Sequence, residues 1–347
     1  MILGILSTKE FLMHTLPTGK LPPDLLEKLL NKIPILDKKI IVGPGTGLDC
    51  SVIDFGDQYL VLKSDPISLT SENIGWYAVQ INVNDIVTTG ADPKWMLTTL
   101  LLPENATTFQ FVENITDQLI LATKEYGITI IGGHTEVTNG IDRPIISATI
   151  IGTVDKDKLI TPLGIEIGDK VFLTKEIAIE TVAILSNDYS DKLSKHLTEQ
   201  ELRKAQSYLY EPGISIYKEA HLIRDGFGVT AMHDPTEGGL ASALWELSIA
   251  SNKTLMVDLN VVPISELTKK ICSFFSINPL NSISSGALLF TVHAENSKAI
   301  IDILEKNKIP VSEIGYVFGD GIGVNHIDQS KPISLPRPER DEITKIF

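Results

Sequence analysis

The sequence predicts an α+β protein with two domains, and three features of the chain support this prediction. Between residues 39 and 154, apolar segments follow the order strands, helix, strand, helix, two strands. This order is typical of helices stacked on one side of an antiparallel or mixed sheet. Residues 155–170 are polar, rich in turn formers and without strong periodicity, as domain boundaries are. A second series of strands and helices then begins at residue 170.

The chain therefore divides into an N-terminal segment with one helix (1–38), a first domain (39–155) and a second domain with a tail (156–347). The helix is expected at residues 21–33, because Pro23 suits the first helical position and leucines repeat on one face. The first domain should contain strands at 39–42, 51–55, 59–63, 95–102, 128–131 and 144–154, and helices at 73–89 and 108–126. The strand at 95–102 is expected to be buried.

The second domain has fewer clear elements. The firmest are a helix that follows Gly238 and Gly239, a helix at 297–306, and strands at 170–174, 255–259 and 287–292. The segment 331–347 contains three prolines and many charges. We expect it to be an irregular segment on the surface.

Composition and charge restrict the class of partner. The net charge is −14, so the chain should repel nucleic acids and anionic lipid surfaces, which are held mainly by Lys and Arg. No apolar stretch reaches the roughly 20 residues that a membrane-spanning helix needs. The first 20 residues lack a basic leader and a cleavage site, and Cys50 and Cys272 form no disulfide framework. We expect a cytoplasmic protein whose two thiols are buried.

The first candidate group is a set of carboxylates. Asp49 follows a glycine-rich loop at 43–47, Asp65 ends a strand, and Asp85 lies inside a helix next to Asn84. An acid among apolar helix residues is costly unless a positive group meets it, and Mg²⁺-bound phosphate is one such group. A solvated helix face or a buried salt bridge would explain Asp85 equally well.

The second candidate group lies at residues 130–137. Here Gly132 and Gly133 permit close backbone approach, and His134 and Glu136 should share one face of an extended chain. They could form a metal-ligand pair or an acid–base pair. An edge strand with polar residues facing water is the alternative, and it is common at strand ends.

The third candidate group lies at residues 232–247. A strand leads into a turn, and Gly238 and Gly239 open a helix whose free N–H groups favour an anion such as phosphate. Thr236 or Asp234 could instead cap this helix. The leucines that follow repeat at helical spacing and are expected to lie in the core.

Three segments resemble a known superfamily. They are Asn84–Asp85 with the Gly-Ala-x-Pro that ends at Pro93, the segment DPTEGGLASALWEL at 234–247, and INPLNSISSGALLF at 277–290. In this order and at these separations they resemble AIR synthase, thiamin-monophosphate kinase, selenophosphate synthetase and the hydrogenase-maturation factor HypE, over residues 20–325. The second and third segments resemble the HypE version.

The resemblance implies a PurM-like fold, in which an N-terminal mixed sheet with helices forms a homodimer and a C-terminal α/β sandwich follows. It also implies Mg²⁺-assisted phosphoryl transfer from ATP, bound near the dimer cleft. Mapped by motif, the metal ligands would be Asp49, Asp65 and Asp85, and the catalytic residues Asp234, Thr236 and His134. The nucleotide-binding residues would be Gly45, Gly47, Asp65, Asn84, Asp85, Gly133, Gly238 and Gly239.

The chain also departs from the family pattern. HypE ends in Pro-Arg-Ile-Cys, whereas no cysteine follows Leu335-Pro336-Arg337 here. The double acid of Gly-Asp-Asp is reduced to Leu48-Asp49, and Glu-Gly becomes Ser285-Gly286. Gly-Asp-Thr-Lys becomes residues 133–136, with His134 and Glu136 at the acid and lysine positions. Thiocarbamate dehydration, the reaction of HypE, is therefore not expected.

Three functions remain open at this stage. The leading hypothesis is an ATP-dependent enzyme that phosphorylates an oxygen of a small or protein-bound acceptor. The second is a nucleotide-binding regulatory module without catalysis. The third is a hydrogenase-maturation role, in which a HypF-type partner supplies the missing thiol. Fold resemblance alone does not decide among them.

Overall fold

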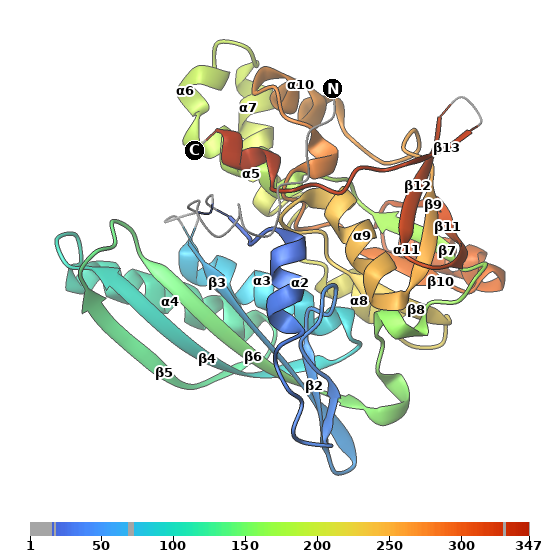
Figure 1. The fold of residues 1–347 in the computed structure, drawn as a ribbon. Coiled ribbons are helices and arrows are strands. Elements are labelled where there is room, and N and C mark those ends of the chain that lie inside the picture. The colour runs from blue at the N-terminus through green and yellow to red at the C-terminus, as the bar shows by residue number, and fades with distance from the viewer. Residues whose placement is uncertain (1–15, 17–18, 69–72, 329–330, 347) are drawn as a thin grey trace.

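The computed structural model describes residues 16, 19–68, 73–328 and 331–346, which form two parts built on one sheet each (Figure 1). The first sheet has the strand order β1-β2-β3-β6-β4-β5, and its neighbours are antiparallel except β4 and β5. The elements of this part are α2 (Pro23–Leu30), β1 (Ile40–Val42), β2 (Ser51–Phe55), β3 (Gln58–Ile67), α3 (Ile74–Thr88), β4 (Asp92–Pro103), α4 (Phe109–Glu125), β5 (Thr129–Thr138) and β6 (Ile145–Asp155). Helices α3 and α4 cover one face of the sheet, which confirms the predicted α+β arrangement.

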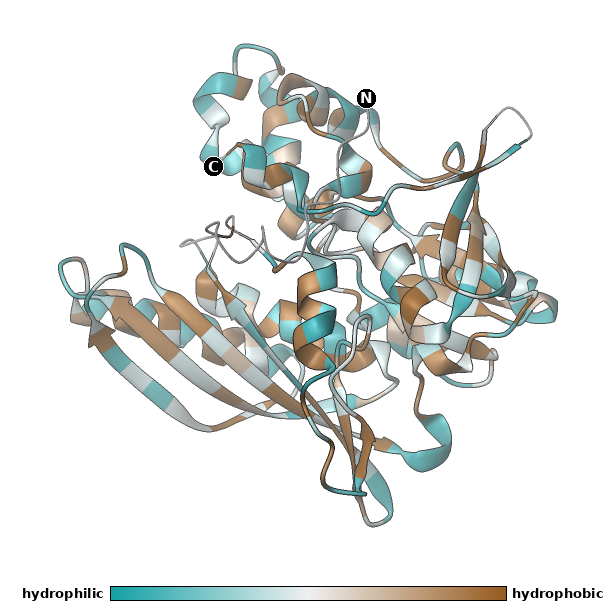
Figure 2. Ribbon diagram, viewed as in Figure 1, coloured by the Kyte–Doolittle hydropathy of each residue, from teal (hydrophilic) through white to brown (hydrophobic). Residues whose placement is uncertain are grey.

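The two faces of this sheet differ in what covers them. Along β4, Met96 and Leu100 are buried beneath the helices, whereas Trp95 and Leu97 on the other face are 39% and 38% exposed. The expectation that strand 95–102 is buried is therefore wrong for one of its faces. Side chains alternate along a strand, and no element of the described residues covers the second face. We call the face beneath α3 the inner face and the opposite face the outer face. Strands β4 and β6 are rich in apolar residues (Figure 2).

Strand β5 is longer than predicted. It was expected to end at Ile131, but it continues through Gly132 and Gly133 to Thr138. A Cβ atom at Gly133 would lie 1.9 Å from the carbonyl oxygen of Thr98, so the close approach of β5 to β4 requires glycine there. Strand β3 likewise continues past Lys63 to Ile67, which places Asp65 inside the strand.

The second part contains a seven-stranded sheet of order β13-β12-β9-β11-β7-β10-β8, in which only β12 and β9 are parallel. Its strands are β7 (Lys170–Thr174), β8 (Val229–His233), β9 (Lys253–Val257), β10 (Leu289–Val292), β11 (Val311–Asp320), β12 (Gly323–Asp328) and β13 (Lys331–Ser334). Its helices are α5 (Ile179–Asp188), α6 (Ser190–Leu193), α7 (Glu199–Gln206), α8 (Tyr217–Ile223), α9 (Gly239–Ser251), α10 (Glu266–Phe274) and α11 (Ser297–Lys306). Among the described residues, every helix is too short or too polar to cross a bilayer.

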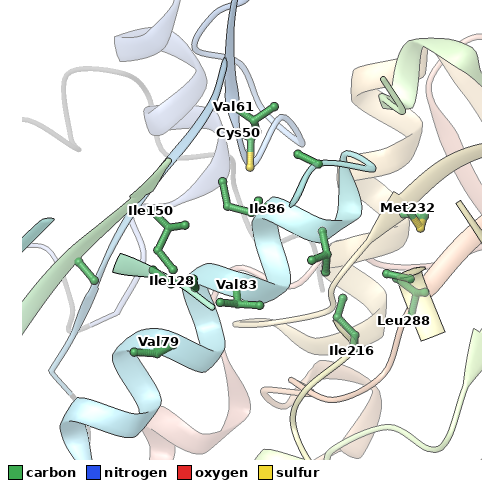
Figure 3. Close-up of a cluster of buried hydrophobic side chains, with 14 of the residues drawn as sticks. Cys50, Val61, Val79, Val83, Ile86, Ile128, Ile150, Ile216, Met232 and Leu288 are labelled. Carbon is green, nitrogen blue, oxygen red and sulfur yellow. The ribbon is translucent and has the colours of Figure 1, made fainter. Parts of the chain in front are cut away.

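Helix α3 joins the two parts. All but one of its residues are buried, and its apolar side chains belong to a core shared with the second part (Figure 3). Asn84 is wholly buried in this boundary: its Nδ2 donates to the carbonyl oxygen of Ile214 at 2.8 Å, and its Oδ1 accepts from the N–H of Ile216 at 3.0 Å. Because both amide groups are satisfied, the burial of this polar side chain fixes α3 against the second part.

The tail is more ordered than predicted. Residues 331–334 form β13, which pairs with β12, and Leu335, Asp341 and Ile343 are buried. The expectation of an irregular surface segment is therefore wrong for these residues. The prolines and charges of the tail predict exposure, but these three buried residues contact segments that are distant in the chain. Asp341, for example, accepts a hydrogen bond from the N–H of Gly238. Both cysteines are free and buried, as expected.

Candidate functional site

Four acidic residues lie at the boundary between the two parts. Asp49 follows the glycine-rich loop, Asp65 projects from the inner face of β3, Asp85 lies on α3, and Asp234 follows β8. The charges of Asp49, Asp65 and Asp234 all act on Asp85, so the four form one group. The structure thus brings together the three predicted metal ligands and one of the three predicted catalytic residues.

Lys63 lies within this group and was not predicted. Its Nζ is 3.2 Å from Asp65 Oδ2 and 3.2 Å from Asp85 Oδ1, and its side chain is only 13% exposed. Burial alone would lower the pKa of Lys63, but the carboxylates of Asp85, Asp49 and Asp65 raise it well above its usual value. The ammonium therefore stays charged. Lys63 and Asp65 are two residues apart on one strand and share a face, which is a signal the sequence does contain.

Asp85 forms a buried ion pair with Lys63 through only one of its two carboxylate oxygens. Its Oδ2 is buried and has no hydrogen-bond partner among the described residues. Burial raises the pKa of Asp85 well above its usual value. The charge of Lys63 opposes this rise only in part, and the negative charges of the neighbouring acids add to it. The structure thus shows that Asp85 lies in a buried salt bridge and not on a solvated helix face. Its second carboxylate oxygen can still bind a positive group.

His233 connects the two parts and was also not predicted. It is 3% exposed; its Nε2 lies 2.9 Å from Glu246 Oε2 on α9, and its Nδ1 lies 2.5 Å from Asp49 Oδ2. Burial alone would lower the pKa of His233, but the charges of Asp49 and Glu246 raise it well above its usual value. Burial would likewise raise the pKa of Asp49, and His233 more than offsets this, so that the pKa is lowered.

Asp234 is the most completely buried of the acids, at 1% exposure. Neither of its carboxylate oxygens has a hydrogen-bond partner among the described residues. Burial, together with the charge of Asp49, raises the pKa of Asp234 to about 7. One donor atom from each of Asp49, His233 and Asp234 lies within 4.8 Å of the other two, which is a spacing that a metal ion could bridge.

The start of α9 has a different cap from those considered above. Neither Thr236 nor Asp234 caps it; instead the N–H of Gly238 donates to Asp341 Oδ2 at 2.6 Å. A carboxylate of the chain's own tail thus lies at this helix start. Thr236 Oγ1 accepts from Lys20 Nζ at 3.3 Å.

The glycines of the candidate site are required by close packing. Gly238 has φ 83°, and a Cβ atom there would lie 2.1 Å from Ser242 Oγ. At Gly239, with φ 62°, a Cβ atom would lie 2.6 Å from the carbonyl oxygen of Ser282. Gly47 has φ 75° and packs so closely on α9 that a Cβ atom would lie 2.2 Å from the carbonyl oxygen of Glu246. This packing holds the loop before Asp49 against the second part.

His134 and Glu136 lie elsewhere, on the outer face. They pair with Thr99 and Leu101 of β4, and His134 Nε2 is 3.0 Å from Glu136 Oε2. Their side chains are 64% and 47% exposed. They do share one face, as expected, but it is the face opposite to Lys63 and Asp65.

Two family models cover most of the chain. Residues 47–154 match the N-terminal domain, and residues 166–327 the C-terminal domain, of AIR synthase related proteins. The chain belongs to the AIR synthase-related family.

Its relatives within the family differ in activity. A putative hydrogenase expression/formation protein of Methanocaldococcus jannaschii is 28% identical over 86% of this chain and 90% of its own length. The carbamoyl dehydratase HypE of Cupriavidus necator is 26% identical over 74% of this chain and 71% of its own. The thiamine-monophosphate kinase of Aquifex aeolicus is 25% identical over 85% of this chain and 95% of its own. The relatives thus confirm the predicted resemblance to HypE, and they show that members of the family catalyse different reactions.

Solved structures agree on the fold. HypE in complex with ATP has a TM-score of 0.66 at 22% identity, covering 90% of this chain and 91% of that one. The thiamine-monophosphate kinase complexed with AMPPCP and TMP has a TM-score of 0.68 at 22% identity, covering 91% and 94%. The HypE–HypF complex gives a TM-score of 0.68 at 21% identity, covering 83% and 93%. The predicted two-domain, PurM-like architecture is thereby confirmed.

Proposed function

We propose that the chain is an ATP-dependent enzyme that transfers a phosphoryl group, with the help of Mg²⁺, to an oxygen of a small or protein-bound acceptor. The observation that carries this proposal is the buried acid group at the boundary between the two parts. Three of its carboxylate oxygens, one on Asp85 and two on Asp234, have no hydrogen-bond partner among the described residues. Buried, unpartnered carboxylates are costly unless a cation meets them.

The residues present fit Mg²⁺. Magnesium prefers oxygen ligands and is commonly held by one or two carboxylates together with substrate phosphates. Asp49, Asp65 and Asp85 would hold it, and Asp85 Oδ2 is an unused donor for this purpose. When bound, the ion would neutralise charge on the phosphates of ATP.

The chain's own groups would position and neutralise the reactants. Lys63, whose pKa the surrounding carboxylates raise, is positively charged inside the acid group, and Lys20 lies against Thr236 at the start of α9. The pKa of Asp234 is about 7, so this carboxylate can accept a proton from an acceptor hydroxyl near neutral pH. Gly45 would let backbone approach the nucleotide. Gly47, Gly238 and Gly239, which pack against other segments of the chain, would shape the site around it, and Thr236 would orient the acceptor.

The relatives support nucleotide use without fixing the acceptor. Solved structures of HypE and of thiamine-monophosphate kinase carry ATP and AMPPCP respectively. The departures at Ser285 and at residues 133–136 keep thiocarbamate dehydration outside this proposal. His134 would act only if a second copy brought its outer face to a nucleotide.

A calorimetric titration with ATP, with and without Mg²⁺, tests the proposal. Wild-type protein should show saturable binding that requires Mg²⁺, and Asp85→Asn should bind at least tenfold more weakly. Asp142→Asn, at an 85% exposed aspartate, is the matched control and should bind like wild type. Circular dichroism must show that Asp85→Asn is folded.

Turnover separates the remaining alternatives. Formation of ADP with a panel of acceptors supports the enzyme, whereas ATP that binds tightly yet stays intact would indicate a regulatory module. No binding at millimolar ATP would contradict both. Capture of a HypF-type partner would favour the maturation role, for which the HypE–HypF complex of relatives is the precedent.

We also propose that the chain pairs with a second copy through the first sheet. The outer face exposes Trp95 and Leu97, and β5 ends the sheet as an exposed edge strand. Exposed apolar faces and unpaired edges are typical of interaction surfaces. Leu97→Asp should convert a dimer to a monomer in size-exclusion chromatography with light scattering, whereas Leu163→Asp, at an exposed leucine of the second part, should leave it paired. A monomeric wild type would contradict the proposal.

A further inference from the structure

A cavity outside the acid group lies where helix α3 of the first part meets α5 and α7 of the second. Its volume, part of which is open to solvent, is about 490 Å³. One water molecule occupies roughly 30 Å³ in the liquid, so the cavity is large enough for a small organic molecule. We propose that this cavity binds a small organic ammonium ion with an apolar body.

The buried part of the lining is apolar. Ala183 and Ile184 of α5 and Leu209, which follows α7, line the cavity and are buried. Tyr77 of α3 packs with them in one hydrophobic cluster. Such a surface favours the hydrocarbon part of a ligand, because apolar area is removed from water on both sides when the two meet.

Two side-chain amides on the second part present acceptors to the cavity. Asn187 Nδ2 donates to the carbonyl oxygen of Ala183 at 2.8 Å, and Gln206 Nε2 donates to that of Ser186 at 3.2 Å. A carbonyl oxygen can only accept, so these bonds fix which end of each amide is the nitrogen. Neither amide oxygen accepts a hydrogen bond from the described residues. Because Asn187 and Gln206 both line the cavity, their oxygens can accept from a ligand N–H.

Tyr77 supplies a third polar atom. Its side chain is 3% exposed and lines the cavity, yet its hydroxyl makes no hydrogen bond with the described residues. Buried tyrosine hydroxyls usually have a partner, as that of Tyr208 does in Ser265. Burial raises the pKa of Tyr77 well above its usual value, and nearby acidic groups add to this effect, so the hydroxyl stays neutral. A ligand N–H would supply the missing partner of its oxygen.

The charge and the aromatic rings around the cavity favour a cation. Asp188 lines the cavity, and among the residues that the structure describes no Lys, Arg or His does. The ring centroid of Trp76 lies 5.5 Å from that of Tyr77 and 5.2 Å from that of Tyr210. The faces of such rings attract ammonium groups. An anion would meet no positive side chain in this lining, so the cavity does not suit a second nucleotide.

The ligand would contact both parts of the chain. Tyr77 belongs to the first part, whereas Asn187 and Gln206 belong to the second. A molecule that binds only the folded chain raises the thermal midpoint, and more so at higher concentration. None of these residues takes part in the proposed phosphoryl transfer, and binding is measurable without nucleotide, so the two proposals can fail separately.

Calorimetric titration of the nucleotide-free protein with phenethylamine and isoamylamine tests the site. The alcohols 2-phenylethanol and isoamyl alcohol are neutral counterparts of nearly the same size. At neutral pH, where the amines are charged, wild type should bind at least one amine saturably. It should bind the matching alcohol about tenfold more weakly, because hydrogen bonds from a charged donor are the stronger ones. The thermal midpoint should rise with the amine and not with the alcohol.

Asn187→Lys is the deciding variant. Asn187 is exposed, so the fold should tolerate the change, and the new ammonium would repel that of the ligand. Amine binding should weaken about tenfold or more. Tyr77→Phe removes the hydroxyl without breaking a hydrogen bond to a described residue, and it should weaken amine binding about tenfold. Asn260→Lys is the matched control: it makes the same change of charge at an exposed asparagine outside the cavity and should bind like wild type.

Circular dichroism identifies any variant that fails to fold, and if Asn187→Lys is one of them, Tyr77→Phe takes its place. A wild type that binds neither amine, or that binds the alcohols as tightly as the amines, overturns the proposal. Amine binding at wild-type affinity by a folded Asn187→Lys overturns it as well, because the ligand would then lie elsewhere.

Discussion

The first sheet carries ionic groups on both faces, and the faces differ in what surrounds these groups. On the inner face, Lys63 lies 3.2 Å from Asp85, and their side chains are 13% and 4% exposed. On the outer face, His134 lies 3.0 Å from Glu136, and their side chains are 64% and 47% exposed. The distances are nearly equal. Exposed pairs contribute about 0–1 kcal/mol, whereas breaking a buried pair costs about 3–5 kcal/mol. Burial, rather than distance, therefore decides how much the loss of each pair should cost in stability.

The largest difference between the faces should appear when the inner cation is removed. Lys63→Met retains the length of the side chain but leaves Asp65 and Asp85 without their ammonium. We expect the free energy of unfolding to fall by about 3–5 kcal/mol. Guanidinium unfolding at pH 8 measures this. Lys94→Met is the control, because Lys94 is 44% exposed and 3.8 Å from Asp92, and it should cost less than about 0.5 kcal/mol. Equal losses in the two variants would show that burial does not separate them.

A buried acid in the second part tests the same principle, because no cation among the described residues is paired with it. Glu180 on α5 is 5% exposed, and burial raises its pKa to about 7 from 4.5. The folded state therefore holds a proton that the unfolded state releases between these values, and stability falls as the pH rises from about 4.5 through 7. At pH 8, Glu180→Gln should raise the free energy of unfolding by about 2–3 kcal/mol relative to wild type.

The gain in Glu180→Gln should shrink towards zero at pH 5, where the wild-type carboxyl is protonated in the folded state. Thermal or guanidinium unfolding at pH 5 and pH 8 measures the difference. Glu295→Gln, at an exposed position, should show no such dependence on pH. A Glu180→Gln variant whose gain is equal at both pH values would indicate improved packing rather than relief of a buried charge.

The sequence predicted the elements in which apolar spacing is clear. The helix expected at 297–306 coincides with α11, and the one at 73–89 contains α3 with one extra residue at each end. Helix α5 was missed because its residues from Ile179 to Ser186 are all buried. A helix that is buried on every side shows no contrast between faces, so periodicity does not reveal it.

The candidate site was only partly predictable for a different reason. Asp49, Asp65, Asp85 and Asp234 were found because they stand in recognisable segments. His233 and Asp341 were not, because each acts through a partner far away in the chain: Asp341 accepts from Gly238, 103 residues earlier. Such pairings depend on the folded arrangement of both parts. Local sequence patterns report only on neighbours within a helix or strand.

The smallest effect is expected on the outer face, at His134. In the Leu97→Asp background, where the proposed pairing of two copies is removed, His134→Ala should change the free energy of unfolding by less than about 0.5 kcal/mol. The reason is that its partner Glu136 and its own ring already face water. Guanidinium unfolding at two protein concentrations measures this. In the wild-type background, a larger loss that depends on protein concentration would mean that a second copy buries the pair. In the monomeric background, a fall in the free energy of unfolding of more than about 1 kcal/mol would contradict the contrast between the two faces, because an exposed pair should contribute less than that.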